Sequence, residues 1–198
     1  MTVVILNSCN KCRGDIEHFT FPEEMEKYFG VFQPGNYWVY YNQDSSKKDS
    51  MYISDFEEKK VTVNEELPPK SDCHSYNEKH FKLHTQYLTR GYNVHEVKYT
   101  FYCCDRWTFD TNISGQAPRP FEIIAKKTSN NSYVFNSSMD TISSLTINNT
   151  EFNDVLRYSA KYPFHTQNIE SLVFFAPNIG IVQYFNGLDT FKISKYSL

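Results

Sequence analysis

The chain has 198 residues, 20 basic and 23 acidic side chains, and a net charge of −3 at pH 7. This length suits one domain, and the nearly balanced charge provides no field for gripping phosphates, so we expect no nucleic-acid partner. After the first residues, no apolar run approaches the roughly 20 residues that a membrane-spanning helix requires.

The N-terminus carries the most informative motif. An apolar residue, a small residue and a cysteine occur in Leu6-Asn7-Ser8-Cys9, which resembles a bacterial lipobox. We predict that Cys9 is the lipidated first residue of the mature protein, and that residues 1–8 are the remnant of a signal peptide. Residues 9–20 would then form an N-terminal tether, and residues 21–198 a single β domain. The membrane is expected as a partner through this lipid, in a compartment where thiols oxidise.

Residues 1–8 are short for a secretory signal, which needs a basic region and an apolar stretch of roughly 7–15 residues. They offer one apolar run, Val3 to Leu6, and no Lys or Arg. We therefore expect codons for basic and then apolar residues upstream of Met1. The alternative is a cytosolic protein that begins with a buried strand and has an ordinary cysteine at position 9.

Aromatic content favours strands over helices. The sequence holds 15 Tyr and 16 Phe, and flat rings pack well on a pleated, half-buried surface. The one helix we predict spans Pro22–Phe29, because proline suits a first helical turn and three glutamates follow near the positive end.

Alternating apolar and polar residues predict strands along the rest of the chain. In order, these are 37–41, 51–56, 61–63, 81–87, 97–104, 121–126, 133–136, 144–147, 153–159, 172–176, 181–185 and 190–196. Turns are predicted at Pro34-Gly35-Asn36, at Asn148-Asn149 and, as the last hairpin, at Asn186-Gly187. The pattern predicts an all-β fold, a curved antiparallel sheet that is a half-barrel or barrel-like, with one short N-terminal helix.

Four segments resemble the uncharacterised small β-rich lipoproteins of Bacteroidota-type bacteria. They are Phe32 to Tyr40, Asp49 to Ile53, Thr146 to Leu156 and Phe174 to Tyr184. The resemblance implies a cell-envelope lipoprotein with an antiparallel sheet, and it implies no activity. It also implies an outer-membrane anchor that faces the periplasm, because residues 10–14 are neutral or basic where surface-exported members of that group carry acidic residues.

The remaining cysteines are candidate disulfide partners. Lipidation of Cys9 leaves Cys12, Cys73, Cys103 and Cys104. Neighbours on a strand point to opposite faces, so Cys103 and Cys104 are each placed to pair with a distant cysteine. Buried free thiols are one alternative. A zinc site is another, since Cys9 and Cys12 have C-x-x-C spacing, but a lipidated Cys9 supplies no thiolate and no second such pair follows. We expect no metal and no cofactor.

Catalytic signatures are missing from the sequence. It contains no G-x-S-x-G, no H-E-x-x-H and no phosphate-cradling glycine loop. The pairs Glu57-Glu58 and Glu65-Glu66 are expected on a solvated surface, and so are His80 and His84, which share one face of a predicted strand. We therefore expect that the protein is not an enzyme.

Two functions fit these expectations. The first is a non-catalytic interaction or structural role, in which a rigid sheet presents its edges and aromatic loops to a protein partner. The second is a carrier whose curved sheet encloses an apolar ligand or acyl chain. A dry cavity of several hundred Å³ would favour the carrier, and a filled core with an exposed apolar patch would favour the interaction protein.

Overall fold

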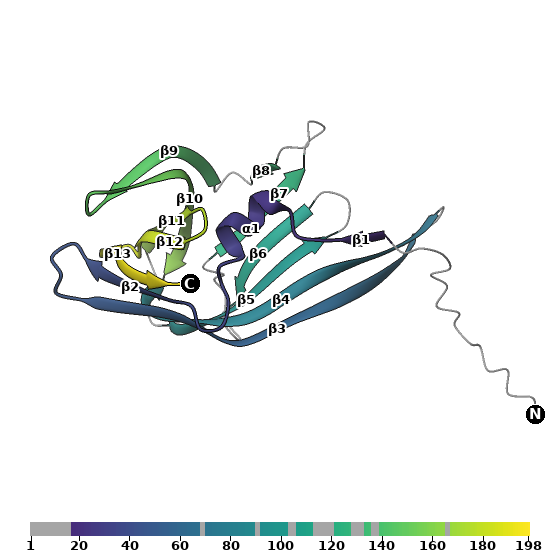
Figure 1. Ribbon diagram of the computed structural model, residues 1–198, viewed down its shortest axis with the longest axis horizontal. Helices are drawn as coiled ribbons and strands as arrows, with labels where there is room; N and C mark the ends of the chain where they lie inside the picture. The colour runs from purple at the N-terminus through teal and green to yellow at the C-terminus, as the bar shows by residue number, and fades with distance from the viewer. Residues whose placement is uncertain are drawn as a thin grey trace, which may run out of the picture.

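Inward-facing aromatic residues on alternating strand positions build one curled sheet around a short helix (Figure 1). The computed structural model describes residues 17–67, 70–89, 92–102, 106–112, 121–127, 133–135, 139–164 and 167–198. The described strands are β1 (Glu17–Phe19), β2 (Tyr37–Asn42), β3 (Lys48–Leu67), β4 (Lys70–Thr89), β5 (Tyr92–Tyr102), β6 (Arg106–Asn112), β7 (Phe121–Lys127), β8 (Tyr133–Phe135), β9 (Met139–Ile147), β10 (Thr150–Phe164), β11 (Gln167–Ala176), β12 (Gly180–Phe185) and β13 (Thr190–Ser197). The helix is α1 (Glu23–Phe29).

The strand order follows the chain in two meanders. One runs β8-β7-β6-β5-β4-β3-β2 and the other runs β13-β12-β11-β10-β9. Antiparallel pairing of β2 with β13 joins them. Within the described ranges, parallel pairing occurs at β1, which lies along His74 to Tyr76 of β4.

The curl of the sheet follows from the connection between its two outermost strands. β8 ends at Phe135 and β9 begins at Met139, and four Cα steps span at most about 14 Å. Neighbouring strands lie about 4.8 Å apart, so a flat sheet with this order would separate β8 and β9 by far more than the chain allows. The sheet must therefore bend round, and the predicted curved, half-barrel fold is confirmed (Figure 1).

Helix α1 lies in the hollow of the half-barrel. Its Met25, Tyr28 and Phe29 are buried, and the Phe29 ring packs 5.2 Å from Phe175 of β11. Phe32, just after the helix, packs against β2 and β4 and is 1% exposed. Among the described residues, aromatic side chains from α1 and from the strands thus fill the concave face.

The helix prediction agrees with the structure within one residue, because Pro22 is the N-cap and α1 ends at Phe29. The strand predictions differ in extent. Segments 51–56 and 61–63 belong to one strand, β3, which also includes the charged residues Glu57 to Lys60 that separate the two predicted segments. β3 and β4, with 20 residues each, are the longest described strands, although 97–104 is the longest of the predicted segments. β6 and β1 were not predicted, and β1 lies within the residues assigned to a tether.

The β11–β12 turn is clasped by residues near the N-terminus. Trp38 Nε1 donates to the Ile179 carbonyl at 2.6 Å, and the Asn178 N–H donates to the Lys27 carbonyl. Gly180 follows with φ of +86°, and a Cβ there would lie 3.0 Å from Val31 Cγ2. Position 180 thus requires glycine for two reasons: its φ is positive, and the segment between α1 and β2 packs too closely against the turn for a side chain.

Gly180→Ala should lower the free energy of unfolding by about 2–4 kcal/mol, because it combines a strained φ with overpacking. Gly35→Ala is the matched control, since Gly35 has φ of +91° but nothing within 4 Å of an added Cβ. Urea unfolding should show that Gly35→Ala lowers the free energy of unfolding by only about 1 kcal/mol. Equal losses for the two variants would contradict the packing argument.

Candidate functional site

A buried carboxylate, Asp49 of β3, organises the polar interior of the half-barrel. It is 1% exposed. Its Oδ2 accepts hydrogen bonds from Thr85 Oγ1 at 2.7 Å, Tyr184 Oη at 2.5 Å and the Tyr87 N–H at 3.3 Å, and its Oδ1 accepts from the Gln86 N–H at 2.8 Å. These four donors match the acceptor capacity of a carboxylate.

The position of Asp49 is explained by a break in the sheet. β4 loses its regular register with β5 between His84 and Thr89, so the intervening N–H groups need other acceptors. Asp49 supplies two of them, and Thr85 Oγ1 accepts a third bond, from the Leu88 N–H at 3.2 Å. Asp49 therefore stabilises the irregular segment of β4 between His84 and Thr89, which we call the bend in β4.

Stacked rings connect this carboxylate to the surface. Tyr87, which is half-buried, stacks on Phe191 with ring centroids 5.1 Å apart, and Phe191 stacks on Tyr184 at 4.9 Å. Tyr40 meets Tyr184 edge-on at 5.4 Å. Burial, and then the charge of Asp49, raises the pKa of Tyr40 and of Tyr184 well above the usual range, so both hydroxyls remain protonated donors.

His95 of β5 is another buried titratable group on this inner face. It is 0% exposed, and neither ring nitrogen has a hydrogen-bond partner among the described residues. Burial lowers the pKa of His95 to about 4, although the nearby charge of Asp49 acts in the opposite direction. The imidazole is therefore neutral at pH 7. Neither His95 nor Asp49 reaches solvent, so neither touches a substrate in this conformation.

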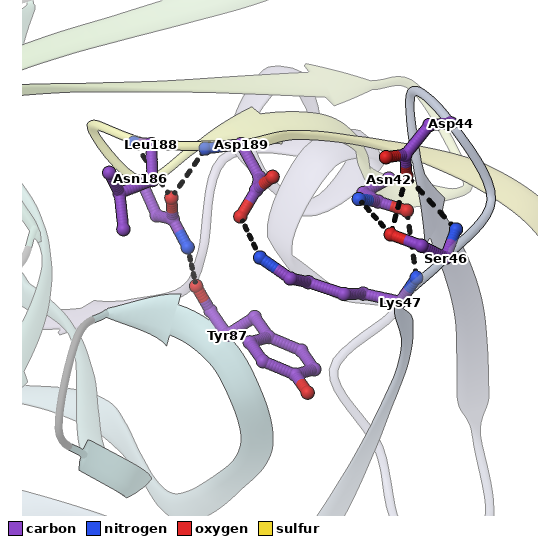
Figure 2. Close-up of polar contacts among 8 residues, drawn as sticks. All are labelled: Asn42, Asp44, Ser46, Lys47, Tyr87, Asn186, Leu188 and Asp189. Carbon is purple, nitrogen blue, oxygen red and sulfur yellow. Dashed lines mark hydrogen bonds and ion pairs between the residues drawn. The ribbon is translucent and has the colours of Figure 1, made fainter.

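Two hairpin loops and the end of β4 meet beside this interior (Figure 2). Lys47 Nζ pairs with Asp189 Oδ2 at 2.6 Å, and this bond raises the pKa of Lys47. Asn186 Nδ2 donates to the Tyr87 carbonyl at 2.7 Å, while its Oδ1 accepts from the N–H groups of Leu188 and Asp189. The β12–β13 turn is thereby tied to both neighbouring segments.

The β2–β3 loop has its own internal hydrogen bonds, which Figure 2 also shows. Asn42 Oδ1 accepts from the Lys47 N–H at 2.9 Å, and Asn42 Nδ2 donates to Ser46 Oγ at 3.2 Å. Ser46 donates in turn to Asp44, which lowers the pKa of that carboxyl. These hydrogen bonds within the loop hold it in one conformation.

A stripe of aromatic and apolar side chains crosses the outer face of the sheet. It consists of Tyr37, Tyr52, His84 and Val94, which are opposed in register on β2, β3, β4 and β5. Tyr52 is 49% exposed and Val94 is 38% exposed. We call these four residues the outer stripe.

The outer stripe is held rigidly at its centre, with Tyr52 and Val94 exposed and Tyr37 and His84 half-buried. The Tyr52 and His84 rings stack with centroids 4.4 Å apart and planes 4° apart. Ser54 Oγ lies 2.6 Å from His84 Nε2 in a hydrogen bond, which fixes the imidazole. Lys195 Nζ lies 6.0 Å from the centre of the Tyr37 ring at the other end of the stripe. Contact there would cost little side-chain entropy.

The cysteines proposed from the sequence lie mostly outside the described residues. Cys9, Cys12, Cys103 and Cys104 are outside the described residues, and Cys73 lies in β4 with only its backbone described. The lipid site and the candidate disulfides stay predictions. His80 is half-buried and hydrogen-bonds to Glu78, while Glu57 and Glu58 are exposed as expected.

Comparison with protein families, curated proteins and solved structures finds no match for this chain. Within the described ranges, no group of three or more His, Cys, Asp or Glu side chains is arranged to hold a metal ion. The helix found there is not long and apolar enough to cross a membrane.

The sequence identified neither Asp49 nor the outer stripe. Asp49 gathers donors from β4 and β12, and the stripe needs the register of four strands. The alternation in segment 81–87 did place His84 on the outer face. No pattern in the sequence indicated that Tyr52 would pair with His84 on the neighbouring strand.

Proposed function

We propose that this chain is a non-catalytic interaction protein of the cell envelope, held at the membrane by lipid on Cys9, which binds a protein partner with the outer stripe. The observation that carries the binding role is the register of Tyr37, Tyr52, His84 and Val94 across four strands. Aromatic side chains that are exposed, contiguous and rigid are typical of protein contact surfaces.

The contents of the hollow favour this role over that of a carrier. A carrier needs space for its apolar ligand, whereas Phe29, Phe32 and Phe175 occupy the concave face among the described residues and are at most 1% exposed. Tyr28 Oη also donates to the Asp154 carbonyl at 2.6 Å, which ties α1 to β10. Among the described residues, the space between α1 and β11 is therefore already filled by side chains.

Strand ends support disulfides as part of the same proposal. β1 begins five residues after Cys12 and pairs with β4 beside Cys73. β5 ends at Tyr102, directly before Cys103 and Cys104, and runs beside β4 as well. The described strands next to these cysteines, β1 and the end of β5, therefore both pair with the first half of β4.

Intact mass tests the envelope assignment. The protein is expressed from its native upstream sequence and measured before and after reduction and alkylation. We expect a mature N-terminus at Cys9 carrying lipid, with thiols that become alkylated only after reduction. An N-terminus at Met1 with five free cysteines would contradict both the anchor and the oxidising compartment.

Site-specific photo-crosslinking tests the outer stripe. A benzophenone amino acid replaces Tyr52 in one variant and Asn153, exposed on β10, in the control, and both are irradiated in the native cells. We expect a discrete adduct from position 52 that disappears when His84→Ala and Val94→Ser are added. Equal labelling at both positions, or an adduct unaffected by those changes, would contradict the proposal.

A further inference from the structure

A polar hollow lies at one end of the seam between the two meanders, apart from the outer stripe. Its volume is about 250 Å³. The lining residues are Tyr41, Asn42, Gln43, Ser45, Asn148, Lys192 and Ser194. They come from β2 and its following loop, from the β9–β10 turn and from β13. We call this site the polar pocket.

The walls of the polar pocket are fixed by hydrogen bonds that do not involve a ligand. Asn42 holds the β2–β3 loop through Lys47 and Ser46, as described above. Asn148 Nδ2 donates to the Ile193 carbonyl at 3.2 Å, which attaches the β9–β10 turn to β13. A preformed site of this kind loses little entropy when it binds.

The remaining polar groups of the pocket are available. Within the described part of the chain, the side chains of Gln43, Ser45, Lys192 and Ser194 make no hydrogen bond or ion pair. Together they offer an amide, two hydroxyls and an ammonium group. Tyr41, 37% exposed, adds the face of an aromatic ring.

This chemistry selects one class of ligand. The lining contains one cation and no carboxylate, which disfavours a metal ion or an amine. It contains no aliphatic side chain, which disfavours an acyl chain. Amides and hydroxyls both donate and accept hydrogen bonds, as sugar hydroxyls do, and an aromatic ring packs against the C–H face of a sugar. The volume lies just below the usual range of about 300–1,000 Å³ for ligand pockets, so it suits a single ring.

We propose that the polar pocket binds one sugar ring of a carbohydrate, with Tyr41 against the ring face and Gln43, Lys192 and Ser194 bonded to its hydroxyls. This inference is independent of the outer stripe, because the two sites share no residue.

Ligand-observed saturation-transfer NMR tests the proposal on the full chain. The probes are glucose, galactose, mannose, N-acetylglucosamine and glucuronic acid, each at millimolar concentration, with inorganic phosphate as a separate competitor. We expect transfer to at least one sugar, persisting in the presence of phosphate. No transfer to any of the five sugars, or complete displacement by equimolar phosphate, would overturn the assignment.

Variants then locate the site. Tyr41→Ala and Lys192→Gln should each raise the dissociation constant of the bound sugar at least tenfold. Tyr196→Ala and Lys195→Gln are the matched controls, because both residues are exposed on β13 and lie outside the pocket; they should change the constant less than twofold. Tyr41→Phe keeps the ring and guards against misfolding of the alanine variant. Equal effects of pocket and control variants would overturn the proposal.

Discussion

Replacing Asp49 by alanine should lower the free energy of unfolding by about 3–5 kcal/mol, the largest effect expected from one substitution among the described residues. The change leaves two backbone N–H groups, of Gln86 and Tyr87, without an acceptor in a buried bend. Each buried donor left unpaired costs about 1–3 kcal/mol. The hydroxyls of Thr85 and Tyr184 lose their acceptor as well. Urea unfolding of the purified variant measures the loss.

Tyr184→Phe is the control for Asp49→Ala. It removes one of the four donors while keeping the ring stack on Phe191, so we expect a loss of about 1 kcal/mol. The double variant should lose less than the sum of the two single losses, because the bond between the two residues is removed in both. An Asp49→Ala loss within 1 kcal/mol of zero would show that the bend does not depend on the carboxylate.

Lowering the pH from 6.5 to 4 should cost the protein about 3 kcal/mol of stability through His95. The pKa of His95 is lowered to about 4 by burial, whereas a histidine in the unfolded chain titrates near 6.5. The unfolded state therefore binds more protons between these values. Stability is fully present above pH 6.5 and falls by about 1.4 kcal/mol per pH unit as the pH drops toward 4.

His95→Leu should remove this pH dependence, because leucine does not titrate. Leucine should also be tolerated there, since neither ring nitrogen of His95 has a hydrogen-bond partner among the described residues that the substitution would remove. His18→Gln serves as the control, since His18 is exposed on β1. Chemical unfolding at half-unit steps from pH 7 to pH 4 compares the three proteins. Parallel curves for wild type and His95→Leu would refute the assignment to His95.

Local signals in the sequence predicted the turns and the helix well. Asn148 and Asn149 both adopt left-handed φ, 49° and 64°, as the turn between β9 and β10 requires. The hairpin at Asn186-Gly187 forms as expected, with φ of +85° at the glycine. These features depend on a few consecutive residues, which is why the sequence alone was sufficient.

Features that depend on register were not predictable in the same way. Glu57 to Lys60 carry charges typical of a loop, yet they extend β3 because pairing with β4 continues through them. Asp55, at φ of +51°, lies in the bulge that precedes them. The partners of Asp49 and the alignment of Tyr52 with His84 similarly follow from pairings between distant segments.

The pairing of β2 with β13 determines when the sheet can be completed during folding. Tyr37, near the start of the first meander, pairs with Ser197, next to the C-terminal residue. Such long-range pairing closes a large loop, which slows folding. During synthesis the open side of β2 has no partner until β13 has left the ribosome, so the nascent sheet carries an unprotected edge while β3 to β12 are made. Loss of β13 would consequently open the sheet in its interior, whereas loss of β9 would shorten it at one edge.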